Sequence, residues 1–266
     1  MYQVTDQIGQ THYFNKPPQR VVSLVPSITY LLHRLDLDDV VLGITRFCKL
    51  PAHFKKSKTI IGGTKQVNFD KVKQLRPDLF IISKEENTKE IADALQSIAP
   101  VFVTDVYDCA SNKALISSMG QIFDIPEKAN LLQAQIDKAK SDLLAIRLQK
   151  TYKTLYFIWQ NPWMTVGGDT FINQMMQLSG FQNIYADQKR YPTVDLSSIN
   201  SKNIDVILLS SEPFPFKEKH RNLLQKQFLH AKILLVEGEP FTWFGAYPDI
   251  GFRYLQNLLK TIANAH

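Results

Sequence analysis

The residues between Trp159 and Gly168 combine aromatic side chains with a glycine pair of the kind found in phosphate-binding loops. The stretch reads WQNPWMTVGG, and a segment with helical spacing follows, capped by Asp169 or Thr170. A P-loop has the pattern GxxxxGK[ST] and a dinucleotide loop has GxGxxG, and neither pattern is present. Asp169 at the start of the helix would also repel a phosphate. We therefore predict that the glycines permit a tight turn and that Trp159 and Trp163 face a ligand.

Aromatic side chains are concentrated in the segments that follow predicted strands of the C-terminal half. They are Trp159, Trp163, Tyr191, Phe214, Phe216, Phe241, Trp243, Phe244 and Tyr247. Loops at strand ends face solvent, so core packing alone does not account for this concentration. A cleft lined with aromatic rings and a few polar groups suits a large flat or amphipathic ligand.

Metal binding and catalysis are the other chemistries that the residue types allow. His53 lies five residues after Cys48, and Glu85 or Glu86 on a nearby loop would complete a metal site. The other histidines are scattered, so we predict no dedicated metal site. Loop acids such as Glu86 and Glu212 could form a carboxylate pair, but no GxSxG, HExxH or Ser-His-Asp arrangement accompanies them. We predict a protein that is not an enzyme and carries no cofactor.

The composition is that of an ordinary globular chain, with 44% hydrophobic and 21% charged residues among 266. The 31 basic and 25 acidic residues give a net charge of +6, and because they are spread along the chain they favour anionic partners only weakly. No polybasic block and no interleaving of basic and aromatic residues predicts a nucleic-acid partner. No apolar run approaches the roughly 18 residues that span a bilayer, and no signal peptide is visible at the start. Cys48 and Cys109 show no CxxC spacing, so we interpret them as two reduced thiols.

Strands and helices alternate along the chain, which predicts parallel α/β sheets. The first strand covers residues 21–25, and the helix after it is expected to be capped by Ser27. The order of elements then recurs. LSSINSKNIDVILLS (residues 196–210) matches FDKVKQLRPDLFIIS (residues 69–83) at a constant offset of 127, with Asp205 falling on Asp78. Two similar α/β lobes are the simplest account of this repeat.

One long helix is predicted between the lobes, because no Gly or Pro interrupts the chain from Glu127 to Lys150. Its apolar stripe consists of Leu132, Ile136, Ala139, Leu143 and Ile146. A helix of this length would measure roughly 35 Å. The predicted fold class is therefore α/β, with an N-terminal lobe (1–125), a linking helix (126–150) and a C-terminal lobe (151–266). Ligands bind beyond the carboxyl ends of parallel strands, so both lobes should contribute contacts from their strand-end loops.

Several stretches resemble one known family. RVVSLVPSITYLLHRLDLDDVVLGITRFCKLP and IGGTKQVNFDKVKQLRPDLFIISKEEN are similar to the first lobe of the helical-backbone (class III) substrate-binding proteins, which are the cobalamin- and siderophore-binding components of bacterial ABC importers. NPWMTVGGDTFINQMMQLSGFQNIYA, RYPTVDLSSI and LLSSEPFPFKEKH are similar to the second lobe of the cobalamin-binding branch. The resemblance covers nearly the whole chain and implies two α/β lobes joined by one long helix.

The resemblance implies a monomer that clamps a small-molecule ligand, a cobalamin-like corrinoid or an iron chelate, between its lobes and works with an ABC permease. It implies a periplasmic location, with a cytoplasmic one as the alternative because no signal peptide is visible. An intracellular protein of the same fold that stores, senses or processes such a ligand, or a transition-metal ion receptor, are alternative functions. Family ligand contacts fall near Phe47, Lys65, Ser83, Trp159, Tyr191, Thr242 and Ala246.

We combine these positions with the strand-end loops to predict a ligand site. The predicted ligand-binding residues are Arg46, Phe47, Lys65, Glu86, Trp159, Trp163, Tyr191, Glu212 and Trp243. The family also docks on its permease through one acidic residue on each lobe. The matching position on the first lobe is Asp70. On the second lobe it is Ser197 or Ser198, of which we predict Ser198, and Asp195 is the nearest acid.

Overall fold

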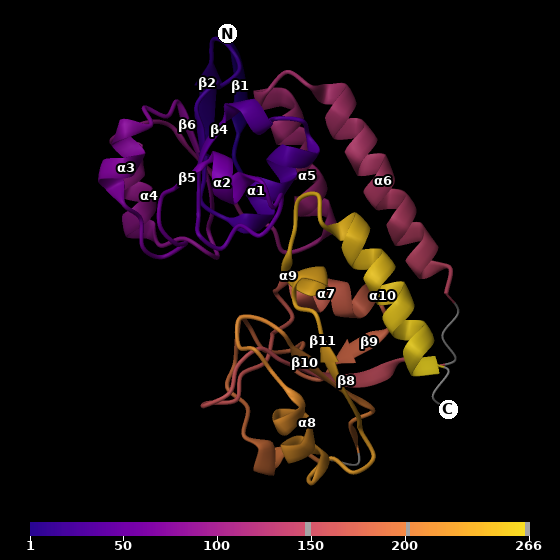
Figure 1. Ribbon diagram of the computed structural model, residues 1–266. Helices are drawn as coiled ribbons and strands as arrows, with labels where there is room; N and C mark the ends of the chain where they lie inside the picture. Colours follow the sequence, from indigo (N-terminus) through magenta and orange to yellow (C-terminus); the bar gives the residue numbers. More distant parts are fainter. Residues whose placement is uncertain (147–149, 201–202, 264–266) are drawn as a thin grey trace. The chain divides into compact units, whose positions relative to one another are not determined.

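The computed structural model describes residues 1–146, 150–200 and 203–263, which alternate between strands and helices as predicted (Figure 1). They form two units, each with its own parallel sheet. The first unit consists of Met1–Asp137 and Trp243–Pro248, and the second of Lys138–Thr242 and Asp249–His266. The predicted lobe boundaries at residues 125 and 150 stay a prediction.

The first unit is built on a five-stranded parallel sheet with the strand order β5-β4-β3-β6-β7. These strands are β3 (Val21–Ser23), β4 (Val41–Ile44), β5 (Thr59–Ile60), β6 (Leu79–Ser83) and β7 (Val101–Thr104). An antiparallel hairpin precedes them, formed by β1 (Tyr2–Thr5) and β2 (Thr11–Phe14). Burial of the strands on both faces explains why they read as continuous apolar runs.

Helices follow each of the five strands of this sheet. They are α1 (Pro26–Arg34), α2 (Phe54–Ser57), α3 (Phe69–Gln74), α4 (Lys89–Gln96) and α5 (Cys109–Ile122), with the 3₁₀ helix η1 (Asp38–Val40) between α1 and β4. Val72 of α3 and Leu95 of α4 pack with Val22 and Phe80 of the sheet in one buried cluster. The prediction that Ser27 caps α1 is wrong. Pro26 already occupies the first helical turn, which suits its fixed backbone angle, and Val25 is the N-cap.

The predicted linking helix is α6 (Pro126–Leu144), which is shorter than expected. Its buried stripe contains Leu132, Ile136, Ala139 and Leu143, as predicted. Ile146 lies beyond the end, where its backbone N–H donates to the Leu143 carbonyl at 3.1 Å. Such an i→i−3 bond tightens the backbone past α-helical geometry and marks the end of the helix. Residues 147–149 of the predicted helix lie outside the described residues. The first unit passes into the second within α6, between Asp137 and Lys138.

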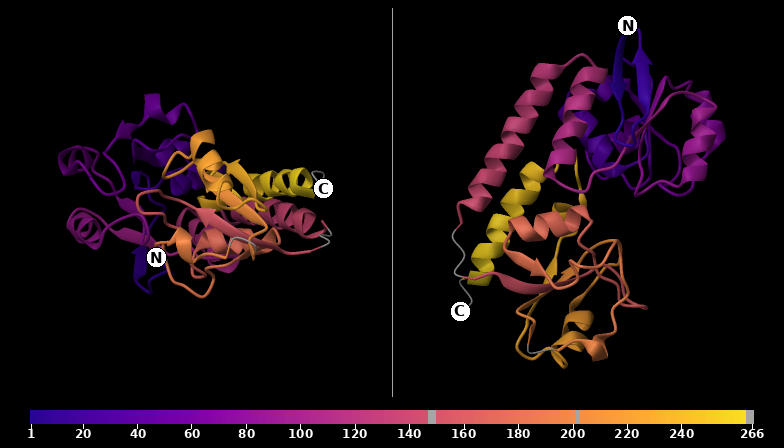
Figure 2. Two further views of the ribbon diagram at one scale, coloured as in Figure 1. Left: turned by 90° about the horizontal axis from the view of Figure 1, so that it is seen from below. Right: turned by 180° about the vertical axis from the view of Figure 1, so that it is seen from behind.

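The second unit is built on a four-stranded parallel sheet with the order β11-β10-β8-β9. Figure 2 shows the ribbon from two further sides. The strands are β8 (Tyr152–Phe157), β9 (Phe181–Asn183), β10 (Val206–Ser210) and β11 (Lys232–Val236). The helices are α7 (Phe171–Leu178), α8 (Glu218–Gln225), α9 (Glu239–Thr242) and α10 (Pro248–Ala263), with the 3₁₀ helix η2 (Leu196–Ser198). Two α/β units with parallel sheets confirm the predicted fold class.

The internal repeat has a physical basis in two aspartates. β6 and β10 have the same length at the predicted offset of 127. The Asp78 carboxylate accepts hydrogen bonds from the backbone N–H groups of Gln19 and Arg20, at 2.8 and 2.9 Å. Asp205, its counterpart, accepts one from the N–H of Lys153 at 2.8 Å. In each unit the carboxylate fixes the chain beside the start of the neighbouring strand, which aligns the two strands before their ladder begins.

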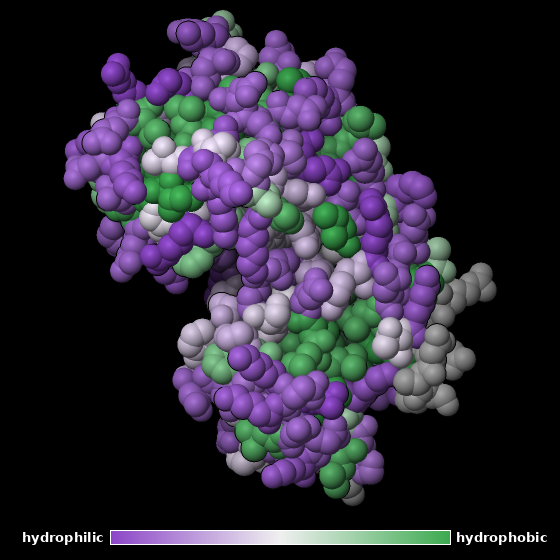
Figure 3. All heavy atoms as spheres, viewed as in Figure 1, coloured by the Kyte–Doolittle hydropathy of each residue, from purple (hydrophilic) through white to green (hydrophobic). Residues whose placement is uncertain are grey.

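The face of each unit that Figure 3 shows is mostly hydrophilic, with apolar patches between the hydrophilic side chains. In the described part of the chain, no helix has both the length and the apolar character needed to cross a bilayer.

Candidate functional site

The strand-end loops of the first unit bring Arg46 and Phe47 against a glycine turn. The N–H of Arg46 donates to the Gly62 carbonyl at 2.8 Å, and its guanidinium lies 5.0 Å from the centre of the Phe47 ring. A Cβ on Gly63 would lie 3.0 Å from the Phe47 ring, so the ring lies in close contact with the turn. Phe47 is 48% exposed. The result is an accessible aromatic ring with a cation stacked on it.

A buried asparagine holds the next loop in place. The Asn87 side chain accepts a hydrogen bond from the N–H of Ser83 at 2.9 Å and donates one to the Thr64 carbonyl at 2.8 Å. It therefore ties the end of β6 to the turn that presents Lys65. Asn87 was not among the predicted site residues, because nothing in its sequence context separates a loop-clamping amide from a solvated one.

Lys65 and Glu86 are exposed side chains of opposite charge on these two loops. The protein around the Glu86 carboxyl raises its pKa by desolvation, and the charge of Lys65 acts in the opposite direction. The loops of the first unit thus present both signs of charge beside one exposed ring.

In the second unit, Trp159 and Trp163 lie on one hairpin-like turn that begins after β8. Trp159 forms an isolated antiparallel bridge with Met164. The Trp159 ring is 40% exposed and meets Phe214 edge-on, with 5.5 Å between centroids. The Trp163 ring is stacked on Phe216 at 5.8 Å and packs with the core of this unit. One tryptophan is therefore partly exposed to solvent, while the other anchors the turn.

Tyr191 lies on the segment next to this turn, because Met164 also forms a bridge with Thr193. The Tyr191 ring is half-buried, with the Arg190 guanidinium 5.4 Å from its centre. The structure therefore brings three predicted aromatic residues of the second unit, Trp159, Trp163 and Tyr191, onto two adjoining strand-end segments. We call these three residues with Phe214 the aromatic platform.

The glycine pair after the turn does not bind phosphate through its backbone. The N–H of Gly167 donates to the Arg190 carbonyl at 2.7 Å, and that of Gly168 donates to the Gln188 carbonyl at 2.9 Å. Both donors are therefore already used. A Cβ on Gly168 would overlap the backbone of Ala186. The glycines are needed for close packing of segment 186–190, whereas we predicted that they serve a tight turn. Thr170, one of the two predicted caps, accepts from the N–H of Asn173 and caps α7.

Glu212 follows β10 and is half-buried. Its Oε1 accepts a hydrogen bond from the Thr242 hydroxyl at 3.0 Å, and its backbone carbonyl accepts one from the Ser210 hydroxyl at 2.6 Å. The side chain is therefore oriented by its neighbours. It lies beside the ends of β10 and β11, where the second unit also has a cavity.

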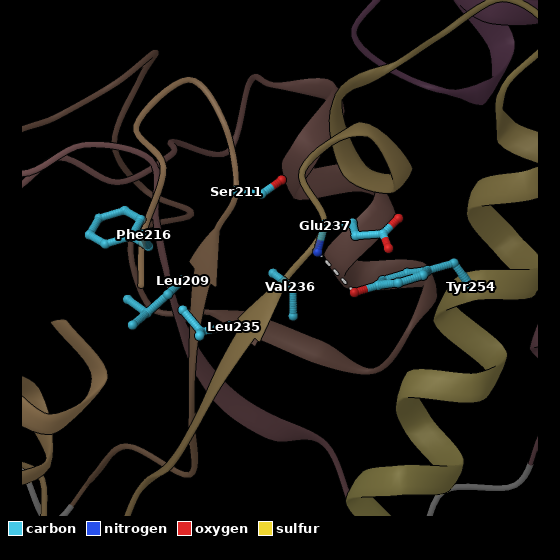
Figure 4. Close-up of a pocket in the computed structure, with 7 residues that line it drawn as sticks. All are labelled: Leu209, Ser211, Phe216, Leu235, Val236, Glu237 and Tyr254. Atoms are coloured by element: carbon cyan, nitrogen blue, oxygen red, sulfur yellow. Dashed lines mark hydrogen bonds between the residues drawn. The ribbon is translucent and has the colours of Figure 1, made fainter. Parts of the chain in front are cut away.

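The cavity has a volume of about 300 Å³ and lies at the carboxyl ends of β10 and β11 (Figure 4). Its lining residues are Leu209, Ser211, Phe216, Leu235, Val236, Glu237 and Tyr254. The Tyr254 hydroxyl accepts a hydrogen bond from the N–H of Glu237 at 3.0 Å. Burial raises the pKa of Tyr254. None of the nine predicted ligand-binding residues lines this cavity, although Phe216 connects it with the Trp163 ring.

Trp243 belongs to the first unit, whereas Trp159 and Trp163 belong to the second. It is 7% exposed, with its ring 5.1 Å from Tyr247 and 6.5 Å from Tyr30 of α1. The segment Trp243–Pro248 is fixed there by Asn112, whose side chain accepts from the N–H of Gly245 at 2.5 Å and donates to its carbonyl at 3.0 Å. A chain segment that follows the whole second sheet thus completes the first unit.

The residues of the alternative metal site do not come together. Cys48 is buried, and its Sγ lies 3.2 Å from the Thr29 hydroxyl. Burial raises the pKa of this thiol. His53 is instead 3.3 Å from the Asp38 carboxylate, which also contacts His33 at 2.8 Å. Among the described residues, no group of three or more His, Cys, Asp or Glu side chains is arranged to hold a metal ion.

The two predicted docking residues are both exposed. Asp70 lies in the first turn of α3. Ser198 lies at the end of η2, where its hydroxyl donates to the Asp195 carbonyl at 2.8 Å. The Asp195 carboxylate itself accepts from the Ser197 hydroxyl at 2.7 Å and from the Ser197 N–H, which lowers its pKa.

Comparisons with known proteins agree with this architecture. The family model described as "Periplasmic binding protein" matches residues 21–234. The ABC transporter substrate-binding lipoprotein YvrC of Bacillus subtilis (strain 168) is 29% identical over 215 residues, which cover 77% of this chain and 68% of that protein. The vitamin B12-binding protein of Yersinia pestis (strain Pestoides F) is 26% identical over 196 residues, covering 72% and 69%.

Solved structures share the fold at lower identity. The periplasmic heme-binding protein RhuT from Roseiflexus sp. RS-1, in apo form, superposes with a TM-score of 0.77 at 19% identity, covering 93% of this chain and 98% of that one. The family resemblance predicted from the quoted stretches is therefore confirmed, and the chain belongs to the periplasmic binding protein family.

Proposed function

We propose that this protein is the substrate-binding component of an ABC importer and that it captures a bulky ligand with a flat or amphipathic surface, of the cobalamin-like or iron-chelate class. The relatives that carry ABC-importer and vitamin B12-binding names support this assignment. Substrate-binding proteins of this family are not enzymes, and we infer that this chain binds its ligand without converting it.

The observation that carries the proposal is the exposed ring of Trp159 in the aromatic platform. A large apolar ring that is 40% exposed costs free energy in water, and here it is held in a fixed orientation by Phe214. Fixed aromatic faces at the carboxyl end of a parallel sheet suit a rigid planar ligand, because little conformational entropy is lost on binding. The first unit offers Phe47 with Arg46 and Lys65, whose charges suit the carboxylate or phosphate groups of such ligands.

Titration with a panel of ligands tests the proposal. Cyanocobalamin, heme and several ferric siderophores would be added separately, with binding followed by calorimetry and tryptophan fluorescence. We expect one class to bind with a dissociation constant in the micromolar range or below. Trp159→Phe should lose much of the fluorescence change. Absence of binding by every compound would contradict the proposed ligand class.

We further propose that the protein acts outside the cytoplasm as a monomer and docks on its permease through both units. Asp70 is the docking acid of the first unit. In the second unit the matching position is Ser198, and the nearest acid, Asp195, is engaged by Ser197. We therefore expect Ser198→Glu to strengthen binding to the purified permease. If Ser198→Glu also strengthens permease binding when Asp70 is replaced by Ala, the contacts made by residues 70 and 198 are independent of each other.

A further inference from the structure

The first unit concentrates positive charge in one segment. Between Arg46 and Arg76 the chain carries nine Lys and Arg residues and a single acid, Asp70. This segment therefore has a charge of +8, although the whole chain has only +6. The remainder of the protein is slightly acidic. The interpretation that the charged residues are spread along the chain is therefore wrong for this segment, whose surplus is diluted in the composition of all 266 residues.

The fold gathers part of this charge along one sheet edge. The segment contains α2, the edge strand β5 and α3. The two helices flank the edge strand, with α2 on the side of α1 and α3 on the side of α4 (Figure 1). The Lys71 ammonium reaches the carbonyl of Ile60 in β5 at 3.4 Å, which places α3 along this strand. Lys58, directly before β5, donates to the Asp38 carbonyl at 2.6 Å. We call Lys55, Lys56, Lys58, Lys71 and Lys73 the basic rim.

Most charges of the basic rim are not neutralised by the protein. Lys55, Lys56 and Lys73 are exposed, and within the described residues none of them forms an ion pair. Of the acids nearby, the Asp38 carboxylate is engaged by His33 and His53. Lysines on an edge strand can serve to block edge-to-edge pairing. However, β5 has only two residues, and neither of them is a lysine. Lys55 and Lys56 lie on α2 and Lys73 lies on α3, so protection of the edge strand does not account for these three lysines.

We propose that the basic rim binds an anionic membrane surface through the headgroups of acidic phospholipids. All five residues of the rim are lysines, which act as hydrated point charges and suit a diffuse layer of charge better than bidentate recognition of one phosphate. The rim also lacks the interleaved aromatic rings with which proteins bind single-stranded nucleic acids. The inference extends the proposed function, since an importer component works beside a membrane. Attraction to the bilayer would keep the loaded protein near its permease.

Sedimentation with lipid vesicles tests the proposal without permease or ligand. The full chain would be mixed with vesicles of phosphatidylcholine alone or with about 30% phosphatidylglycerol. We expect binding only to the acidic vesicles, and a loss of binding between 50 and 300 mM salt as the Debye length falls below about 10 Å. Each lysine near a charged leaflet contributes about a fivefold increase in partitioning. The variant Lys55→Gln/Lys56→Gln/Lys73→Gln should therefore bind about a hundredfold more weakly.

A matched control separates the rim from net charge. Lys113→Gln/Lys219→Gln/Lys226→Gln removes the same charge from exposed positions outside the segment and should keep vesicle binding within a few-fold. Equal losses in both variants, or equal binding to neutral vesicles, would overturn the proposal. Rim-dependent binding to a DNA duplex without binding to acidic vesicles would overturn it in favour of a nucleic-acid partner. Both variants should still bind the ligand identified by titration. Ligand binding without vesicle binding would contradict only the membrane proposal, whereas vesicle binding without ligand binding would contradict only the proposed function.

Discussion

Trp159 and Tyr191 are the residues on which the proposed ligand site depends most directly. Replacing either by Ala removes an aromatic face, and stacking is worth about 0.5–1.5 kcal/mol beyond the burial of the ring itself. We expect each substitution to raise the dissociation constant by about tenfold or more. Leu229→Ala, which removes a 72% exposed apolar side chain elsewhere in the second unit, should leave affinity unchanged. Unchanged affinity in folded Trp159→Ala and Tyr191→Ala would refute the aromatic platform.

His220 predicts a pH dependence of stability. Its ring is buried against Phe214 and Phe216, and Nδ1 accepts a hydrogen bond from the Lys217 N–H at 2.8 Å. Burial lowers the pKa of His220, and the nearby charge of Lys219 lowers it further. The unfolded chain, with a histidine pKa near 6.5, therefore takes up this proton first. The stabilisation is complete above about pH 6.5 and is lost as pH falls toward the lower native pKa.

Urea unfolding at pH 7.5 and 5.0 measures this effect. We expect the wild-type midpoint to fall more over this range than that of His220→Asn, because asparagine can still accept the bond that caps α8 without titrating. If the two proteins lost the same stability, the pH dependence would have to come from other groups.

Among the elements, the segment Trp243–Pro248 depends on one side chain of α5. Asn112→Ala would leave the buried N–H and carbonyl of Gly245 without their partner. Each unpaired buried group costs roughly 1–3 kcal/mol, so we expect a loss of about 2–4 kcal/mol in the free energy of unfolding. Gln121→Ala, at an exposed position of the same helix, should change stability by less than about 0.5 kcal/mol. Chemical denaturation of both variants checks this, and equal stabilities would rule out the clamp.

The approach of segment 186–190 to Gly168 gives a second prediction at this scale. Gly168→Ala would place a methyl group on the Ala186 backbone, and overpacking of this kind costs about 1–3 kcal/mol. Gly9→Ala is the informative comparison, because nothing lies within 4 Å of its added methyl and only its positive φ of 92° is unfavourable. Thermal unfolding of both variants, together with ligand affinity, would show whether Gly168 supports the platform. If Gly168→Ala were as stable as the wild type, residues 186–190 would be able to move away from the added methyl group.

Sequence patterns predicted the elements better than their mutual contacts. β6 and β10 were recognisable because a buried parallel strand is an unbroken apolar run, and Asp78 and Asp205 fall at equivalent positions because they perform the same task. The end of α6 was missed since no Gly or Pro marks it. The packing of Trp243 on Tyr30 could not be read from periodicity, because it joins residues more than two hundred positions apart. The hydrogen bonds of the Asn87 side chain to Ser83 and Thr64 could not be predicted from periodicity either.

At the scale of the whole molecule, the chain passes between the two units three times. The passages lie after Asp137 in α6, after Thr242 and after Pro248. A continuous helix resists bending in the absence of Pro, Gly or a bulge, and the two further passages add to this restraint. We expect ligand binding to change the radius of gyration very little. Solution scattering with and without ligand measures this, and a large closure would show that the helix and the returning segment act as a hinge.

The return of Trp243–Pro248 to the first unit also has a consequence for synthesis of the chain. Residues 1–137 leave the ribosome about 100 residues ahead of the segment that completes their fold. At roughly 5–20 residues per second, that delay lasts about 5–20 s. During this interval Tyr30 and Leu31, which Trp243 and Gly245 later cover, lack their final partners. The first unit therefore finishes folding only after nearly the whole polypeptide has been made, so its maturation is tied to the last stage of translation.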